Sequence, residues 1–67
     1  MLAHVTINFD YQFGRKIIKD TNERHAIDLP SPFTYKQAKE AAEKVLVEKF
    51  IKLHGKARIQ VNRVLFN

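Results

Sequence analysis

The chain has 67 residues, of which 45% are hydrophobic and 28% charged, with no cysteine and a formal net charge of +5. This length allows one domain around one small core, and the composition is that of a folded globular protein rather than a disordered segment. Without cysteine, disulfides and thiolate metal sites are excluded. No segment reaches the ~20 apolar residues of a membrane span, and the first residues lack the pattern of a signal peptide, so we expect a cytoplasmic protein without membrane contact.

Alternating polarity predicts a strand over residues 3–13. One face of this strand is apolar and contains Ala3, Val5, Ile7, Phe9, Tyr11 and Phe13. Gly14 interrupts the alternation as a turn or as a bulge, so residues 3–19 form either one bent strand or two. The following residues predict short strands at about 15–20 and 24–29. A reverse turn at Asp20–Glu23 is expected to join them, because Asn22 tolerates the left-handed conformation of such turns.

A helix is predicted over residues 35–54. Thr34 and Gln37 have the spacing of a capping box at its start, and Gly55 suits the left-handed position that follows a helix. Lys49 falls within the apolar side of the helix, where its stem is expected to lie along the edge while its ammonium reaches water. The apolar side itself is expected to pack on the sheet and contains Tyr35, Ala38, Ala42, Val45, Leu46, Phe50 and Leu53.

A last strand is predicted over residues 57–66, and its alternation breaks at Arg63–Phe66, which indicates a bulge or a packed end. Together the elements predict a single α+β domain of residues 1–67. We expect a small, mainly antiparallel sheet of three or four strands with one α-helix packed on one face. Along the chain, two or three strands come first, followed by the helix and a last strand.

Few residues suggest chemistry. His4, His25 and His54 lie far apart and lack the spacing of metal-ligand motifs, and Ser31 has neither a nearby base nor a nucleophile-elbow motif. The two glycines do not form a phosphate-binding loop. We therefore expect no catalytic residue, no metal and no cofactor, and we expect that the protein is not an enzyme.

Basic residues are concentrated in the second half of the chain. Residues 1–33 hold four basic and four acidic side chains, whereas residues 34–67 hold eight basic and three acidic ones. A positive field at one end of a small domain attracts polyanions, and amide side chains hydrogen-bond base edges. The predicted nucleic-acid-binding residues are Lys49, Lys52, Lys56, Arg58, Gln60 and Asn62. Single-strand stacking is not expected, because the aromatic residues of the first strand share its inward face.

The first functional hypothesis is therefore a small basic, non-catalytic accessory protein that binds nucleic acid through its basic C-terminal half and the polar face of the sheet. The alternative is a protein-interaction or inhibitor module, as a monomer or a homodimer, that uses a free edge strand or a helix patch of Val47 and Ile51. Both patch residues project from the helix side where solvent is expected, although isolated apolar surface residues are also common. An acidic protein surface is attracted by the same positive field.

Overall fold

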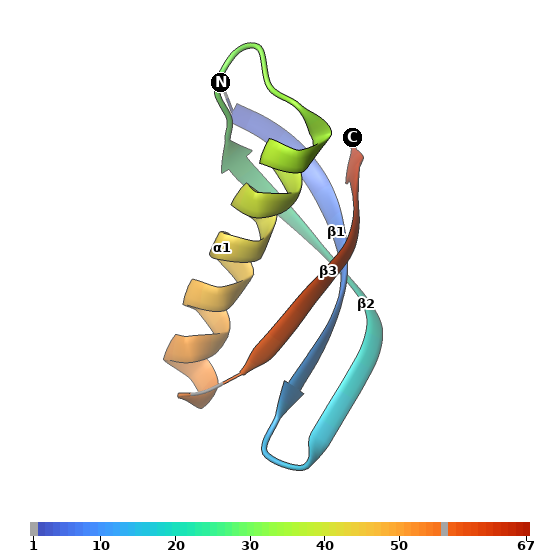
Figure 1. The fold of residues 1–67 in the computed structure, drawn as a ribbon, viewed down its shortest axis with the longest axis vertical. Coiled ribbons are helices and arrows are strands. Elements are labelled where there is room, and N and C mark those ends of the chain that lie inside the picture. The colour runs from blue at the N-terminus through green and yellow to red at the C-terminus, as the bar shows by residue number, and fades with distance from the viewer. Residues whose placement is uncertain (1, 56) are drawn as a thin grey trace.

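In the computed structural model, the elements follow in the order β1 (Leu2–Phe13), β2 (Lys16–Asp28), α1 (Tyr35–His54) and β3 (Arg58–Phe66). The structure describes residues 2–55 and 57–67. The strands form one antiparallel sheet in the order β2-β1-β3, and α1 lies across one of its faces (Figure 1). The predicted α+β architecture is confirmed, with three strands.

The turn between β1 and β2 lies at Gly14–Arg15, and the reverse turn predicted at Asp20–Glu23 is wrong. Phe13 pairs with Lys16, and the ladder extends from there to the far ends of both strands. Gly14 has a φ of 57°, which glycine adopts without the steric cost of a Cβ atom. The two short strands predicted before the helix are therefore one strand, and the chain before Asp20 forms two strands rather than one bent strand.

A β-bulge lies in β2 at Asp20, where the sequence predicted a turn. Asp20 does adopt a left-handed conformation, with a φ of 59°. The register shifts at this point, so that Asp10 of β1 faces both Lys19 and Asp20 of β2. The backbone N–H of Asp20 donates to Asp10 Oδ1 at 2.8 Å and holds the bulge closed. Turns and bulges both use left-handed residues, and here the chain continues in the same direction.

A second bulge lies in β3 at Asn62, next to the predicted break in alternation. Asn62 Nδ2 donates to Asn8 Oδ1 at 3.0 Å and to Asp10 Oδ1 at 3.1 Å. Asn8 is only 3% exposed, and its own amide donates to Asp20 at 2.8 Å and to Asn22 at 2.9 Å. These contacts satisfy a buried amide and join the two bulges across β1.

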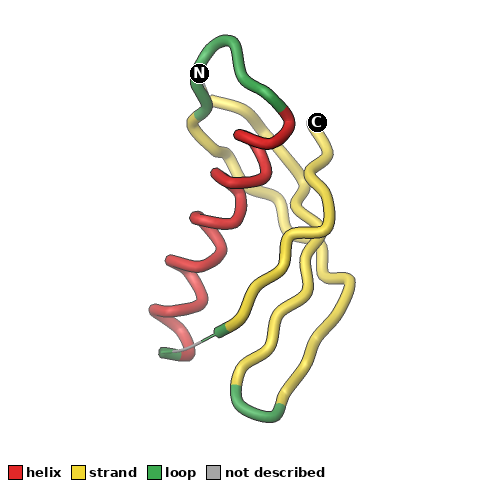
Figure 2. Tube along the Cα trace, viewed as in Figure 1, coloured by secondary structure: helices red, strands yellow, loops and turns green. Residues whose placement is uncertain are grey.

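The ends of α1 are those that the sequence predicts (Figure 2). The hydroxyl of Thr34 accepts from the backbone N–H of Gln37 at 3.2 Å, and the side chain of Gln37 accepts from the backbone N–H of Thr34 at 2.8 Å. The N–H of Gly55, at a φ of 78°, donates to the carbonyl of Ile51 at 2.9 Å. The capping box and the glycine stop are therefore confirmed.

The core lies between α1 and the sheet. Tyr35 and Leu53, which were expected there, occupy the terminal turns of α1 and are 49% and 62% exposed. The hydroxyl of Tyr35 accepts from the backbone N–H of Val64 at 3.0 Å. The buried apolar side chains are Val5, Ile7, Phe9, Ile27, Leu29, Ala38, Ala42, Leu46, Phe50, Val61 and Val64.

Within the described residues, no helix combines the length and the apolar character needed to cross a bilayer.

Candidate nucleic-acid interface

The tip of the β1–β2 hairpin, the last turn of α1 and the start of β3 meet at one end of the molecule, the lower end in Figure 1. The rings of Phe13 and His54 stack with their centroids 4.0 Å apart, and Gln12 pairs with Arg58. A cavity of about 260 Å³ between the hairpin tip and β3 is lined by Gln12, Phe13, Gly14, Ala57 and Arg58. We call the surface formed by residues 11–19, 49–55, 57 and 58 the basic end.

The basic end holds an unbalanced share of the charge. Residues 11–19 and 49–58 contain seven basic and no acidic side chains, whereas the rest of the chain contains five basic and seven acidic ones. Lys56, one of the predicted binding residues, lies outside the described residues. The basic side chains that the structure describes here are Arg15, Lys16, Lys19, Lys49, Lys52 and Arg58.

The hairpin cations Arg15, Lys16 and Lys19 were missed by the sequence reasoning. Basic and acidic residues are equal in number over residues 1–33, so this half of the chain has no net charge. The predicted turn at Asp20–Glu23, instead of at Gly14–Arg15, also places these cations away from the end of the hairpin. The available signal was the absence of any acidic residue between Asp10 and Asp20. Only the pairing of the hairpin and the stacking of Phe13 on α1 bring these cations beside the predicted ones.

Most cations of the basic end are free to meet a ligand. Arg15, Lys52 and Arg58 are exposed and make no hydrogen bond or ion pair with another described residue. Lys16 Nζ lies 6.0 Å from the ring centroid of Phe13, which leaves its charge at the surface. Exposed and unpaired cations keep their full attraction for an approaching anion.

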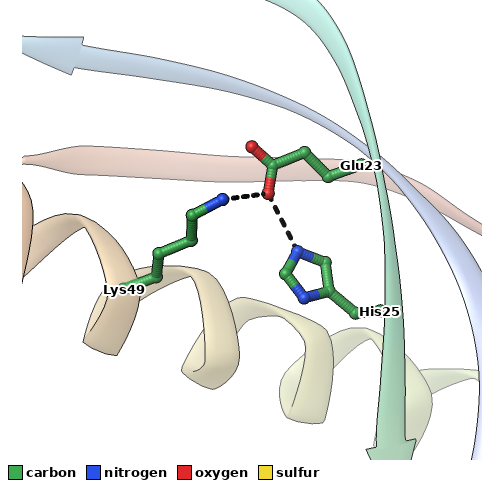
Figure 3. A network of polar contacts seen from close by, with 3 residues as sticks. All are labelled: Glu23, His25 and Lys49. Atoms are coloured by element: carbon green, nitrogen blue, oxygen red, sulfur yellow. Dashed lines mark hydrogen bonds and ion pairs between the residues drawn. The ribbon is translucent and has the colours of Figure 1, made fainter.

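Lys49 is the exception, because its ammonium forms an ion pair with Glu23 (Figure 3), although its side chain remains 41% exposed. Its Nζ donates to Glu23 Oε1 at 2.8 Å, and the same oxygen lies 2.9 Å from Nε2 of His25. Partial burial raises the pKa of Glu23, but hydrogen bonds from Lys49 and His25 outweigh that effect and lower the pKa overall. Lys49 therefore joins α1 to β2, and Glu23 neutralises its charge.

The two predicted amides of β3 differ in availability. Gln60 is exposed and pairs with Asp10, whereas the amide of Asn62 donates to Asn8 and Asp10 within the protein. The backbone N–H of Asp20 lowers the pKa of Asp10 most, followed by the Asn62 amide, against a smaller effect of desolvation, and the charge of Lys19 lowers it further. Gln60 thus remains available to a ligand, and Asn62 is engaged in holding its bulge.

The open face of the sheet away from the basic end has mixed charge. Arg24 is placed opposite Thr6, and Arg63 opposite Asn8, on the face that α1 does not cover. The carboxylates of Asp20 and Asp10 accept hydrogen bonds from Asn8 and Asn62, and Asp10 also lines a hollow with Lys19 and Arg58 of the basic end. This part of the open face therefore carries both signs of charge.

Val47 and Ile51, the two residues of the predicted helix patch, differ in exposure. Val47 is half-buried and lines a hollow of about 710 Å³ together with Glu43 and Ala57. Ile51 is 49% exposed. The expectation that both side chains project into solvent therefore holds only for Ile51.

In residues 2–55 and 57–67, no three His, Asp or Glu side chains gather in a way that would hold a metal ion. The ring nitrogen of His25 is bound to Glu23, and the ring of His54 is stacked on Phe13. No protein-family model, curated protein or solved structure matches this chain. Function is therefore inferred from the charges and the geometry of the basic end.

Proposed function

We propose that this protein is a non-catalytic nucleic-acid-binding protein whose basic end contacts the phosphate backbone. The observation that supports this proposal is that residues 11–19, 49–55, 57 and 58 meet at one end of the fold and together carry six basic and no acidic side chains. Lysine and arginine side chains bind phosphates and release the counterions condensed on the polymer. Binding of this kind needs no pocket, which suits a domain of 67 residues.

The proposal predicts a steep dependence of affinity on salt. Among the described residues of the basic end, five cations make no hydrogen bond to a carboxylate: Arg15, Lys16, Lys19, Lys52 and Arg58. If four or five phosphates are neutralised, the slope of log affinity against log salt on duplex DNA is about −4. The measurement is a fluorescence-anisotropy titration of a labelled duplex of about 20 base pairs at several salt concentrations between about 20 and 200 mM.

A pair of charge reversals tests the location of the site. Arg15→Glu combined with Arg58→Glu is expected to abolish binding at all but the lowest salt. Lys36→Glu combined with Lys44→Glu changes the net charge equally, away from the basic end, and is expected to change affinity only a few-fold. Circular dichroism verifies that both double variants stay folded. An equal loss of affinity in the two double variants would show that binding depends on net charge rather than on the basic end. If the wild type does not bind nucleic acid at low salt, the proposed function is wrong.

A second candidate function is strand addition at the free edge of β2. This strand has 13 residues and lies at the edge of the sheet, and no other described strand pairs with its outer side. Exposed strand edges pair readily with another chain. A second copy that adds its strand there would double the mass measured by analytical ultracentrifugation, while a monomer mass at every concentration contradicts the homodimeric form of this candidate.

A further inference from the structure

Three side chains form a row across the open face of the sheet at the basic end. Gln12 of β1 pairs with Ile17 of β2 on one side and with Arg58 of β3 on the other. Directly opposite residues of antiparallel strands project from the same face. The neighbours of Gln12 in β1 stack on α1, Tyr11 on Phe50 and Phe13 on His54, so the row projects away from the helix.

The row is open to a ligand. All three side chains are exposed, and Ile17 is 58% exposed although it is a large aliphatic residue. None of the three makes a hydrogen bond or ion pair with another described residue. The hollow of about 710 Å³ that Val47 and Glu43 of α1 line reaches this row at the sheet, where its lining contains Gln12, Ile17, Arg58, Lys19, Gln60 and the acidic Asp10. Gln12 therefore lies at the centre of the row, with the exposed aliphatic side chain of Ile17 on one side and the unpaired guanidinium of Arg58 on the other.

The three side chains have the chemistry of base-edge recognition in the major groove of DNA. A guanidinium binds the two acceptors of guanine, a carboxamide binds the acceptor and donor of adenine, and an aliphatic group contacts the methyl group of thymine. Strands are ~4.8 Å apart, so a row over three strands is about 10 Å wide, and the major groove of B-DNA is about 12 Å wide. The row therefore fits the groove in width as well as in chemistry.

The same geometry disfavours the other nucleic acids. Single strands are bound mainly by stacking on exposed aromatic rings, but the rings of Tyr11 and Phe13 face the helix, where Phe50 and His54 stack on them. The major groove of duplex RNA is too narrow and deep for side chains on a sheet to reach base edges. Of these nucleic acids, only duplex DNA can contact both the row and the cations beside it.

From these observations we propose that the basic end binds duplex DNA in its major groove and that Gln12, Ile17 and Arg58 read base edges there. This inference rests on the proposed nucleic-acid-binding function and adds the class of nucleic acid and the reading residues. Arg15 and Lys16 at the hairpin tip and Lys52 at the end of α1 contact the flanking phosphates. Phosphate contacts position the protein, and the row supplies the sequence preference.

The test begins with selection of preferred sequences from a randomised duplex DNA library by the wild-type protein. Affinity is then measured for the selected duplex, its separate strands and the RNA duplex of the same sequence. We expect the DNA duplex to bind at least about tenfold more tightly than the other two, since only it presents readable base edges in a wide groove. Gln12→Ala is expected to lose roughly 5- to 150-fold in preference for the selected sequence, with an unchanged salt slope.

His4→Ala is the matched control, because His4 lies on the same face of β1 at its other end and is exposed. It is expected to leave affinity and selected sequence unchanged. Selection without an enriched sequence, equal binding of single strands or RNA, or an unchanged preference in Gln12→Ala would overturn the inference. The proposed function survives those results if Arg15→Glu with Arg58→Glu still abolishes salt-dependent binding, and both fall if no nucleic acid binds at low salt.

Discussion

A single contact decides whether a basic side chain is available to a ligand. Lys49 and Arg58 both belong to the basic end, yet Lys49 donates to Glu23 at 2.8 Å while Arg58 has no partner among the described residues. Sequence spacing placed Lys49 on the helix correctly but gave no sign of Glu23, which is 26 positions away. Partners so distant in sequence are brought together only by packing of the helix on the sheet.

At Glu23, the lowered pKa predicts a loss of stability in acid. A carboxyl group whose folded pKa lies below its ordinary value of 4.5 stabilises the fold above that pH, and the contribution is lost as pH falls through the folded pKa. Glu23→Gln should remove this part of the pH dependence, about 0.2–1 kcal/mol because the pair is partly exposed. The measurement is the free energy of unfolding in urea at a series of pH values.

Glu40→Gln is the control for that experiment, because Glu40 is exposed on α1 and has no ion pair with a described residue. Its unfolding free energy is expected to follow the wild-type pH curve. Some acid sensitivity should remain in Glu23→Gln, because the pKa of Asp10 is also lowered. If Glu23→Gln and the wild type lose stability in parallel between neutral pH and pH values below about 4, the Glu23 contact is not a source of the acid dependence.

At the scale of elements, the helix was predictable and the hairpin was not. The limits of α1 depend on Thr34, Gln37 and Gly55, whose hydrogen bonds all lie within a few residues of the helix ends. The local preference of Asp20 for a left-handed conformation suits a turn and a bulge equally. The choice between them depends on pairing with β1, in which Asp20 binds both Asp10 and Asn8.

At the bulge residue Asp20, glycine is expected to be more stabilising than alanine, the reverse of the usual order in a strand. At its φ of 59°, a Cβ atom costs about 1–2 kcal/mol, so Asp20→Gly should be more stable than Asp20→Ala by roughly that amount. Thr21 lies next to it in β2 and is paired with Phe9. At Thr21 the order should reverse, with Ala more stable than Gly by about 0.5–1 kcal/mol.

Urea denaturation of the four variants measures both differences. Because each pair differs only by one methyl group, the lost side-chain contacts of Asp20 or Thr21 cancel within the pair. Equal stability of Asp20→Gly and Asp20→Ala would show that Asp20 does not hold a left-handed conformation in solution.

For the whole molecule, a small margin of stability depends on few core side chains. A domain of 67 residues is expected to have an unfolding free energy of roughly 3–10 kcal/mol. Phe50 of α1 is 5% exposed and its ring contacts those of Phe9, Tyr11 and His54. This cluster attaches the last turns of α1 to β1 and thereby assembles the basic end.

Phe50→Ala should therefore destabilise the protein by about 3–5 kcal/mol, which removes most of its stability. Leu53→Ala, at a position 62% exposed in the last turn of the same helix, should change the free energy by less than about 0.5 kcal/mol. Thermal unfolding followed by circular dichroism compares the two variants. Similar melting temperatures for both would mean that the aromatic cluster does not anchor the helix.

The sequence by itself determined the fold class, the limits of the helix and the inward face of β1, because caps and periodicity act over a few residues. It also identified Lys52, Arg58 and Gln60 as exposed polar residues near one another in the chain. Tertiary structure alone decided that the hairpin turns at Gly14, that Arg15 and Lys16 join the basic end, and that Lys49 and Asn62 form contacts with other side chains of the protein. Those outcomes depend on strand register and helix docking, which are set by contacts between residues far apart in the sequence.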